Sequence, residues 1–268
     1  MKSNNIMTNQ AKILNYKQIG TGLHVVLIHG LFGSLENLNM VAKQLSQDYC
    51  VTSVDVRNHG NSFHVDTMDY TELSKDIINL LDYLAINKCV LLGHSMGGKI
   101  AIQVALEQPQ RITKLLVADI APVSYPAHHL RIIEGLQAID LSQVFKRKDA
   151  DTQLMSFVDD IGVRQFLLRN LVLDSQGKFT FKCNIDNIAL CYPQIMMANQ
   201  IPTNKVAYQG ETLFIKGSNS DYILPEYKEA ITALLPNSKA KIIQGAGHWL
   251  HAEKTIVFNK IVLDFINS

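Results

Sequence analysis

The sequence predicts an α/β protein with a mostly parallel central sheet flanked by helices. Short apolar runs alternate with longer segments of helical spacing, which is the pattern of parallel strands joined by crossover helices. The 268 residues, of which 47% are hydrophobic, can bury a large core but approach the size at which chains divide into domains. The alternation also stops between residues 122 and 213, so we expect an insertion there.

The strands are predicted from continuous apolar runs, which suit strands covered on both faces by helices. These runs are residues 25–29, 51–55, 89–92, 114–120, 213–216 and 240–243. The earlier and more polar segment 12–19 is predicted as an antiparallel strand at the edge of the sheet. Apolar stripes at helical spacing predict helices within residues 73–84, 100–106 and 256–266.

The insertion, residues 122–208, is predicted to be a mostly helical cap between two parts of one core, residues 1–121 and 209–268. Within it, helical periodicity recurs at residues 130–137, 154–158 and 166–171, and a turn is predicted at 174–177 before the short run 179–181. Most of the apolar cap residues are expected to form the cap's own core, and some of them, such as Phe157 and Phe166, are candidates to line an acyl pocket.

Charge and composition exclude several classes. Lys and Arg number 25 against 24 Asp and Glu, so no field that would attract a nucleic acid is expected, and the balance fits a neutral or apolar substrate. Residues 1–10 lack the apolar region of a signal peptide, and the apolar run 23–32 is too short to span a membrane. The four cysteines show no paired C-x-x-C spacing, so a cytoplasmic location is predicted.

Residues 93–98 read Gly-His-Ser-Met-Gly-Gly and fit the G-x-S-x-G nucleophile elbow between a strand and a helix. The abrupt turn lifts the serine side chain above the sheet, and the glycines let the two backbones approach closely. The helix N-terminus favours negative charge at the reacting oxygen. Ser95 is therefore the candidate nucleophile, and an ordinary strand-to-helix turn is the alternative interpretation.

Residues 29–33, His-Gly-Leu-Phe-Gly, form a second glycine-bracketed loop after a predicted strand. Ester hydrolysis passes through a tetrahedral oxyanion, and each backbone N–H directed at it lowers the barrier by about 3 kcal/mol. We assign this oxyanion hole to the N–H groups of Met96 and Leu31, with Phe32 as the alternative to Leu31 and as a substrate-binding residue. Alone, the loop fits a structural turn or a phosphate cradle equally well.

A third segment, Gly-His-Trp at 247–249, follows the last predicted strand. The order of serine first and histidine last is that of α/β-hydrolases. His248 is the candidate general base, a role suited to imidazole because it titrates near neutral pH. His251 is the competing base and is otherwise interpreted as a partly buried packing residue.

The remaining histidines are given structural roles. His94 is expected to pack below the elbow, His59 to lie in a loop, and His128 and His129 to lie on the cap surface. No group of His, Cys or carboxylate residues has metal-ligand spacing, and the glycine-rich loops lack nucleotide-binding patterns. We therefore expect neither a metal nor a cofactor.

A triad also needs a carboxylate that orients the base and stabilises its imidazolium form. In α/β-hydrolases this acid usually follows the strand before the histidine strand, here residues 213–216. Ser220 stands where that aspartate is expected, so the acid is displaced or absent. Asp221 and a relay through Ser220 are the local alternatives.

Several longer segments carry a resemblance. They are Leu-Phe-Gly-Ser at 31–34, Asp-Val-Arg-Asn-His-Gly at 55–60, residues 93–99, Asp-Ile-Ala-Pro-Val at 119–123 and Gly-His-Trp-Leu-His-Ala-Glu-Lys at 247–254. Together they resemble the YbfF-type esterases of the α/β-hydrolase superfamily, over residues 25–255 and only loosely in the cap. The resemblance implies an α/β-hydrolase fold, hydrolysis of acyl esters and acyl thioesters, and Asp119 as the acid that orients His248. Within these segments, Arg57 and Lys99 are interpreted as structural residues, and Arg57 is expected to brace the 55–62 loop by ion pairing.

The predicted function is serine hydrolysis of a small-molecule acyl ester or thioester, without nucleic acid or membrane partners. Two alternatives are kept: another cap-type chemistry, such as C–C bond hydrolysis or a lyase reaction, and a non-catalytic ligand receptor on the same fold. The basic run at residues 146–148 is interpreted as an exposed helix end balanced by Asp149 and Asp151, in preference to a contact with coenzyme A phosphates.

Overall fold

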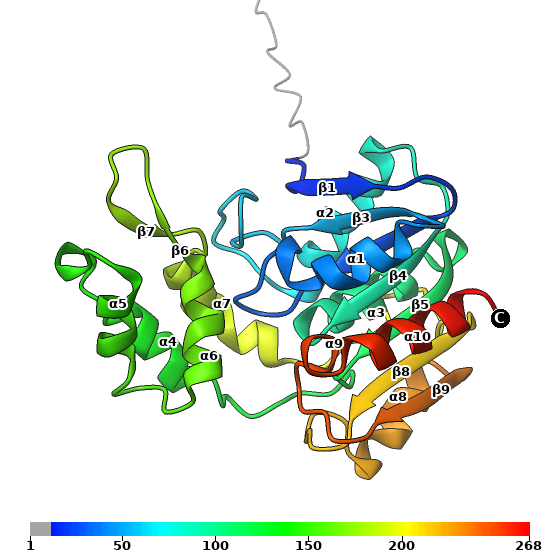
Figure 1. The fold of residues 1–268 in the computed structure, drawn as a ribbon. Coiled ribbons are helices and arrows are strands. Elements are labelled where there is room, and N and C mark those ends of the chain that lie inside the picture. The colour runs from blue at the N-terminus through cyan, green and yellow to red at the C-terminus, as the bar shows by residue number, and fades with distance from the viewer. Residues whose placement is uncertain (1–11) are drawn as a thin grey trace, which may run out of the picture.

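A computed structural model describes residues 12–268, and a seven-stranded sheet forms its centre (Figure 1). The strands are β1 (Tyr16–Ile19), β2 (His24–Ile28), β3 (Cys50–Val54), β4 (Cys89–His94), β5 (Ile112–Ala118), β8 (Thr212–Gly217) and β9 (Ser238–Ile243). Their spatial order is β1-β3-β2-β4-β5-β8-β9, and every pairing is parallel except that of β1 with β3. This confirms the predicted fold class and the antiparallel edge strand. Residues 1–10, on which the signal-peptide prediction rests, lie outside the described residues.

The strand boundaries differ from the prediction by one or two residues at most ends. The largest shift is in β1, which was expected from residue 12 and begins at Tyr16. Strand β5 was expected to extend to residue 120 and stops at Ala118. Asp119 has a φ of 53°, so the chain leaves the sheet there although the apolar run continues. The hydrophobic pattern alone does not register this turn.

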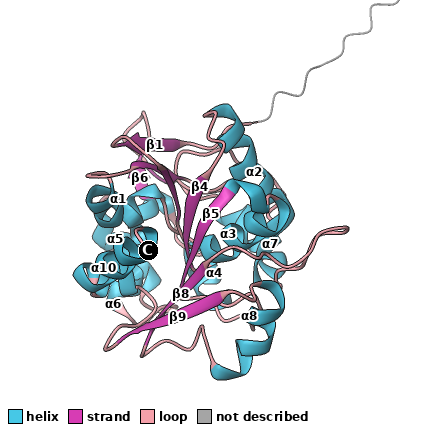
Figure 2. Ribbon diagram, turned by 90° about the vertical axis from the view of Figure 1, so that its right-hand side faces the viewer, coloured by secondary structure: helices cyan, strands magenta, loops and turns pink. Residues whose placement is uncertain are grey.

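Helices cover both faces of the sheet (Figure 2). The core on one face packs α1 (Asn39–Leu45) and α10 (Thr255–Ile266) against alternate strand residues such as Val25 and Leu27. The core on the other face packs α2 (Tyr70–Tyr83), α3 (Met96–Glu107) and α8 (Lys228–Leu234) against Val26 and Ile28. The three predicted helices correspond to α2, α3 and α10, whereas α1 and α8, each of two turns, carry too short a stripe to be predicted.

The predicted cap segment contains α4 (Leu130–Gln137), α5 (Arg147–Leu154), α6 (Ile161–Leu167), α7 (Ile185–Met196) and a hairpin of β6 (Leu171–Leu173) and β7 (Phe179–Phe181). These elements form the lobe at the left of Figure 1. The turn expected at 174–177 joins the two hairpin strands. The division at residues 122 and 208 stays a prediction.

Two parts of the cap differ from the expectation. The periodic segment 154–158 is not helical, because α5 ends at Leu154 and the N–H groups of Phe157 and Val158 both donate to the Leu154 carbonyl as an uncontinued turn. Residues 166–171 divide among α6, a 3₁₀ turn (Leu168–Asn170) and β6. Helix α7 was not predicted; it contains Pro193, which sequence reasoning takes as a helix break.

Arg57 has the structural role that was expected of it, with partners on a helix. Its guanidinium donates to the two carboxylate oxygens of Asp76 on α2 at 2.6 and 2.8 Å, and to Thr67 and Glu72. These contacts tie the 55–62 loop to α2. The four cysteines are buried and free, and no helix among residues 12–268 is long and apolar enough to cross a membrane.

Candidate active site

Ser95 lies at the sharp turn between β4 and α3. Its φ of 54° and ψ of −124° are a strained conformation for a residue with a side chain. A Cβ on Gly93 would lie 2.0 Å from the carbonyl oxygen of Gly97, and one on Gly97 would lie 2.3 Å from the carbonyl oxygen of Ile28. The two glycines thus permit the close contact of strand and helix that holds Ser95 above the sheet.

Three predicted residues form one hydrogen-bonded chain. Ser95 Oγ lies 3.0 Å from His248 Nε2, and His248 Nδ1 lies 2.8 Å from Asp119 Oδ2. Asp119 is fully buried directly after β5, and its other carboxylate oxygen accepts the N–H of Gly217 at 3.0 Å. With Nδ1–H donating to Asp119, Nε2 is left to accept the Ser95 proton.

The structure places the two alternative acid-loop residues differently. Ser220 is buried and its hydroxyl donates to Asp119 Oδ2. Asp221 is exposed, and its side chain makes no hydrogen bond to residues 12–268. Ser220 therefore belongs to the group around Asp119, and Asp221 lies apart from it.

The two candidate oxyanion donors are N–H groups that are not used in the hydrogen bonds of the described residues. The N–H groups of Leu31 and Met96 have no hydrogen-bond partner within residues 12–268. The N–H of Phe32 donates to His59 Nε2 at 3.0 Å, so it is already occupied and Leu31 is the open donor of the loop. The Phe32 side chain lines the pocket at Ser95.

Sequence reasoning missed a pair of histidines that join the loops after β2 and β3. His59 accepts the N–H of Phe32, and in return His29 Nε2 accepts the N–H of Val56 at 3.1 Å. Each ring donates its Nδ1–H to a nearby backbone carbonyl, of Arg57 for His59 and of Gly30 for His29. Burial lowers the pKa of His59 to about 3 and also lowers the pKa of His29, so both rings stay neutral acceptors.

Tyr222 and His129 were also missed. The ring of Tyr222 stacks on His248, with centroids 4.0 Å apart and planes at 21°. Its hydroxyl lies 2.7 Å from His128 Nε2 and 3.3 Å from His129 Nε2. His128 is exposed as expected, but the prediction was wrong for His129, which is partly buried and lines the pocket at Ser95. Its Nδ1 also lies 3.0 Å from the Tyr192 hydroxyl, and burial lowers its pKa to about 3.

The two other histidines near the site support its backbone. His94 Nε2–H donates to the carbonyl oxygen of His248 at 2.8 Å, which fixes the main chain of the candidate base from below. His251 is buried against the His94 ring, with centroids 4.5 Å apart, and makes no hydrogen bond to Ser95. His251 therefore has the packing role that the sequence analysis gave as the alternative to a general base. No group of three or more His, Cys, Asp or Glu residues in the described chain is placed to hold a metal.

A cavity of about 170 Å³ surrounds Ser95 and His248. Its apolar lining comes from the loop after β2, from the cap and from Trp249 beside the base; these residues are Leu31, Phe32, Ile132, Val163, Phe166, Leu167 and Trp249. Phe157, the other cap aromatic considered, packs in the cap around Gly135 instead. We refer to this cavity as the apolar pocket.

A nucleophile elbow above a mostly parallel sheet, with a histidine delivered after the last strand, defines the α/β-hydrolase class. The alpha/beta hydrolase fold family matches residues 24–255, and the chain belongs to that family. It is 39% identical over 250 residues to the sn-1-specific diacylglycerol lipase ABHD11 of Mus musculus, covering 90% of this chain and 80% of the relative.

A bacterial relative and a solved structure agree with this placement. The chain is 36% identical over 245 residues to Esterase YbfF of Escherichia coli K12, covering 91% of this chain and 93% of the relative. It is also similar to the structure of a marine microorganism esterase, with a TM-score of 0.91, 35% identity and coverage of 95% and 100% of the two chains. The family resemblance seen in the sequence is confirmed.

Proposed function

We propose that this protein hydrolyses acyl esters with Ser95 as nucleophile, His248 as general base and Asp119 as the acid that orients it. The observation that carries the proposal is the continuous hydrogen-bonded chain from Ser95 through His248 to Asp119, with contacts of 3.0 and 2.8 Å. Relatives named esterase and lipase, at 36–39% identity over most of the chain, confirm the broader prediction of a carboxylic ester hydrolase.

The first half of the reaction forms an acyl-enzyme. Ser95 Oγ attacks the ester carbonyl carbon while its proton passes to His248 Nε2. The carbonyl oxygen becomes an oxyanion that accepts the N–H groups of Leu31 and Met96, and the N-terminus of α3 favours its charge. When the intermediate collapses, the bond to the leaving group breaks and the imidazolium returns the proton to the departing alcohol or thiol.

The second half repeats these steps with water. His248 removes a proton from water, the hydroxide attacks the acyl carbonyl, and the carboxylic acid leaves as Ser95 regains its proton. Asp119 stays ionised throughout and stabilises the imidazolium at Nδ1. Because Asp119 is fully buried, the hydrogen bonds from Gly217 and Ser220 offset the cost of removing its carboxylate from water.

The apolar pocket favours an apolar group of modest size next to the ester carbonyl. Its volume of about 170 Å³ lies below that of most drug-sized ligand sites, and its lining is largely aliphatic and aromatic. Epoxide hydrolases are among the structural neighbours, at 18% identity, which shows a common fold alone. Serine at the elbow favours an acyl-enzyme mechanism over their chemistry.

The test is hydrolysis of p-nitrophenyl acetate, butyrate and octanoate by wild type, Ser95→Ala and the control Ser156→Ala, whose serine is exposed on the cap. We expect Ser95→Ala to lose about 10⁴-fold or more of kcat and Ser156→Ala to match wild type. A mass spectrum after reaction with a fluorophosphonate should show the adduct on Ser95. Unchanged turnover by Ser95→Ala would contradict the proposal, and a wild type without turnover or adduct would favour a ligand receptor.

A paired measurement separates oxygen esters from thioesters. Butyryl esters of an alcohol and of the corresponding thiol present the same acyl group to the apolar pocket, so their kcat/KM values differ only through the leaving group. Turnover of both that depends on Ser95 would extend the proposal to thioesters, and turnover of the oxygen ester alone would restrict it.

A further inference from the structure

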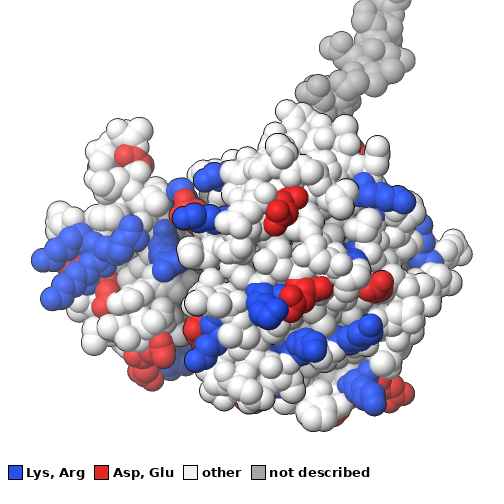
Figure 3. Space-filling model, turned by 45° about the vertical axis from the view of Figure 1, so that its right-hand side comes forward, with Lys and Arg blue, Asp and Glu red and all other residues white. Residues whose placement is uncertain are grey.

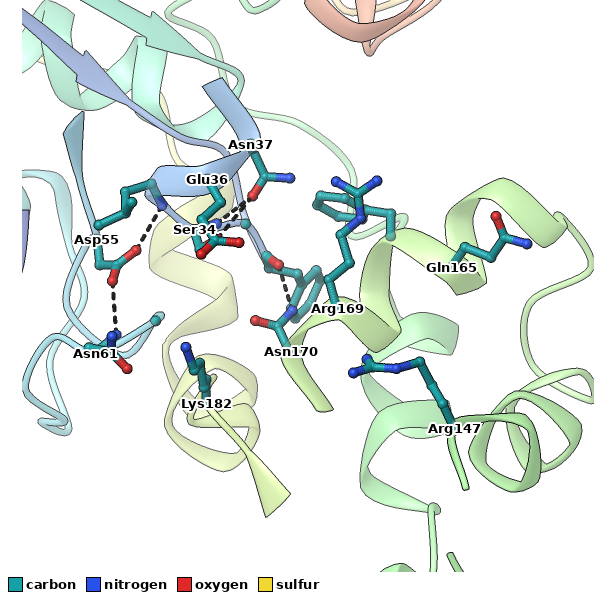
Figure 4. A pocket seen from close by; sticks show the side chains of 15 residues that line it. Ser34, Glu36, Asn37, Asp55, Asn61, Arg147, Gln165, Arg169, Asn170 and Lys182 are labelled. Carbon is teal, nitrogen blue, oxygen red and sulfur yellow. Dashed lines mark hydrogen bonds between the residues drawn. The ribbon is translucent and has the colours of Figure 1, made fainter. Parts of the chain in front are cut away.

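A second cavity of about 420 Å³ adjoins the apolar pocket, and Figure 4 shows the side chains that line it. The two cavities share Phe32, Gly33, Asn37 and Phe166 in their linings, so they are neighbours. The second cavity extends between the loops after β2 and β3 on the core and the elements α5, α6 and β7 of the cap. We refer to it as the basic cavity.

Three cationic side chains line the basic cavity from the cap. Arg147 comes from the first turn of α5, Arg169 from the 3₁₀ turn after α6, and Lys182 from the end of the β6–β7 hairpin. Arg147 donates to the carbonyl oxygen of Leu168. None of the three forms an ion pair with a carboxylate in residues 12–268. Their charges therefore remain available to a ligand.

The two carboxylates of the lining are on the core side (Figure 4). Asp55 is buried and accepts hydrogen bonds from Asn15 Nδ2 and the N–H groups of Leu35 and Asn61, at 2.7, 2.7 and 2.9 Å. Both carboxylate oxygens of Asp55 therefore already accept hydrogen bonds from the protein. Glu36 is exposed. The charged side chains of the cap wall are therefore all cationic. Arg147 and Lys182 extend toward the space between the walls (Figure 4).

The basic run at residues 146–148 is an exposed helix end, as the sequence predicted, at the start of α5. Asp149 accepts the N–H groups of Phe145 and Lys146, both at 3.0 Å, and Asp151 pairs with Arg164 at 2.8 Å. Asp149 thus stays beside the run at the start of α5, and neither acid forms an ion pair with a side chain of residues 146–148. Figure 3 shows lysine and arginine side chains gathered on the cap lobe, and of the run only Arg147 lines the basic cavity.

We propose that the basic cavity binds an anionic group, a phosphate or a carboxylate, at the end of the substrate remote from the ester that Ser95 cleaves. The inference rests on the proposed function for the ester itself. Arginine forks match the oxygens of both anions, and of the three cations Lys182 is half-buried while Arg147 and Arg169 are exposed. The net charge of the whole chain is near zero, although the cations of the cavity lie on one wall. The substrate that fits both cavities is apolar near the ester and charged at one end.

Two pairs of substrates test the proposal and separate the two sources of charge. The first compares p-nitrophenyl butyrate with the mono-p-nitrophenyl ester of adipic acid, whose acyl end carries a carboxylate. The second compares butyrylglycerol with butyrylglycerol 3-phosphate, whose alcohol carries a phosphate. We expect kcat/KM of the wild type to favour one charged member over its neutral partner by about tenfold, and the advantage to fall with added salt.

The variants locate the effect. Arg169→Gln and Lys182→Gln should each lower kcat/KM for the favoured charged ester about three- to tenfold more than for its neutral partner. Glu36→Gln should raise the preference for the charged ester, because it removes a repelling charge. The matched control is Lys148→Gln, which removes an exposed cation from the same run outside the cavity and should leave the preference unchanged.

The outcomes distinguish this proposal from the catalytic one. Serine-dependent turnover without preference for either charged ester would overturn the basic-cavity proposal alone. If no ester is turned over, the catalytic proposal fails. Calorimetry with adipate and glycerol 3-phosphate then shows whether the basic cavity binds an anion. Binding to the wild type that Arg169→Gln weakens about tenfold would support an anion site, and no binding would overturn it.

Discussion

The hydroxyl of Ser220 donates a hydrogen bond to Oδ2 of Asp119, the atom that also faces Nδ1 of His248. Ser220 follows β8, where the acid of an α/β-hydrolase is expected, whereas Asp119 follows the neighbouring strand β5. The register pairs Ala118 with Ile215, so both loops leave the same edge of the sheet. An acid supplied from β5 can therefore reach the histidine while the serine of the usual position supports it.

This arrangement predicts a ranking of three variants. Asp119→Asn should fold and lose about 10⁴-fold of kcat, because an amide cannot stabilise the imidazolium or fix its tautomer. Ser220→Ala should lose about three- to tenfold, since one hydrogen bond to a buried charge disappears. Asp221→Asn should match wild type. The measurement is kcat on p-nitrophenyl butyrate, with thermal melts to verify folding, and a larger loss in Asp221→Asn than in Asp119→Asn would refute the assignment.

The residues that local motifs predict and the residues that they miss differ in a physical way. Ser95 and His248 lie in turns whose backbone requires particular neighbours, so the spacing of glycines identifies them. Asp119 lies in a turn with a positive φ that no local spacing of glycines marks, and it was found only through the family resemblance. The contact of Tyr222 with His248 forms between two separate loops, and nothing in either loop's own sequence specifies its partner.

In the fold, too, local sequence patterns predict some elements and miss others. The buried parallel strands are continuous apolar runs, so all seven strands of the sheet were predicted within a few residues. The cap was predicted as helical, but α7 was missed although its buried residues keep helical spacing on both sides of Pro193. The basic cavity was not foreseen, since Arg147, Arg169 and Lys182 come from three different elements and meet only in the folded cap.

Stacking of Tyr222 on His248 should hold the imidazole in its reactive orientation. We expect Tyr222→Ala to lower kcat about two- to tenfold, the range given by one aromatic contact, with a smaller change in KM. Tyr222→Phe keeps the ring and loses only the hydroxyl contacts to His128 and His129, so it is the matched control and should stay near wild type. Equal losses of kcat in the two variants would assign the effect to the hydroxyl.

His59 should act as a positioning residue for the oxyanion loop. Its Nε2 accepts the N–H of Phe32, the residue next to the open donor of Leu31. His59→Ala should therefore lower kcat about tenfold with little change in KM, because the loss affects the transition state rather than substrate binding. His64→Ala removes an exposed histidine from the same loop region and should leave kcat unchanged. A rise in KM alone for His59→Ala would argue against this role.

Lys99 links the two connections between the core and the predicted cap. Its side chain is almost fully buried one turn after Ser95, and its ammonium donates to the carbonyl oxygens of Val123 and Met197. The ammonium also lies over the Tyr70 ring, 4.7 Å from the centroid. Burial lowers the pKa of Lys99 to about 7, from an ordinary value of 10.5.

This shift predicts how the free energy of unfolding depends on pH. Below pH 7 both the folded and unfolded chains keep the Lys99 proton, so the cost of the buried charge is fully present. Between pH 7 and 10.5 the folded chain has lost that proton while the unfolded chain still binds it, so stability rises with pH, by about 2 kcal/mol from pH 7 to 9. Lys99→Met should lack this rise, and Lys75→Met, which removes an exposed lysine, should keep it. Urea unfolding of the three proteins at pH 7, 8 and 9 measures the slopes, and parallel curves for wild type and Lys99→Met would show that Lys99 does not titrate in this range.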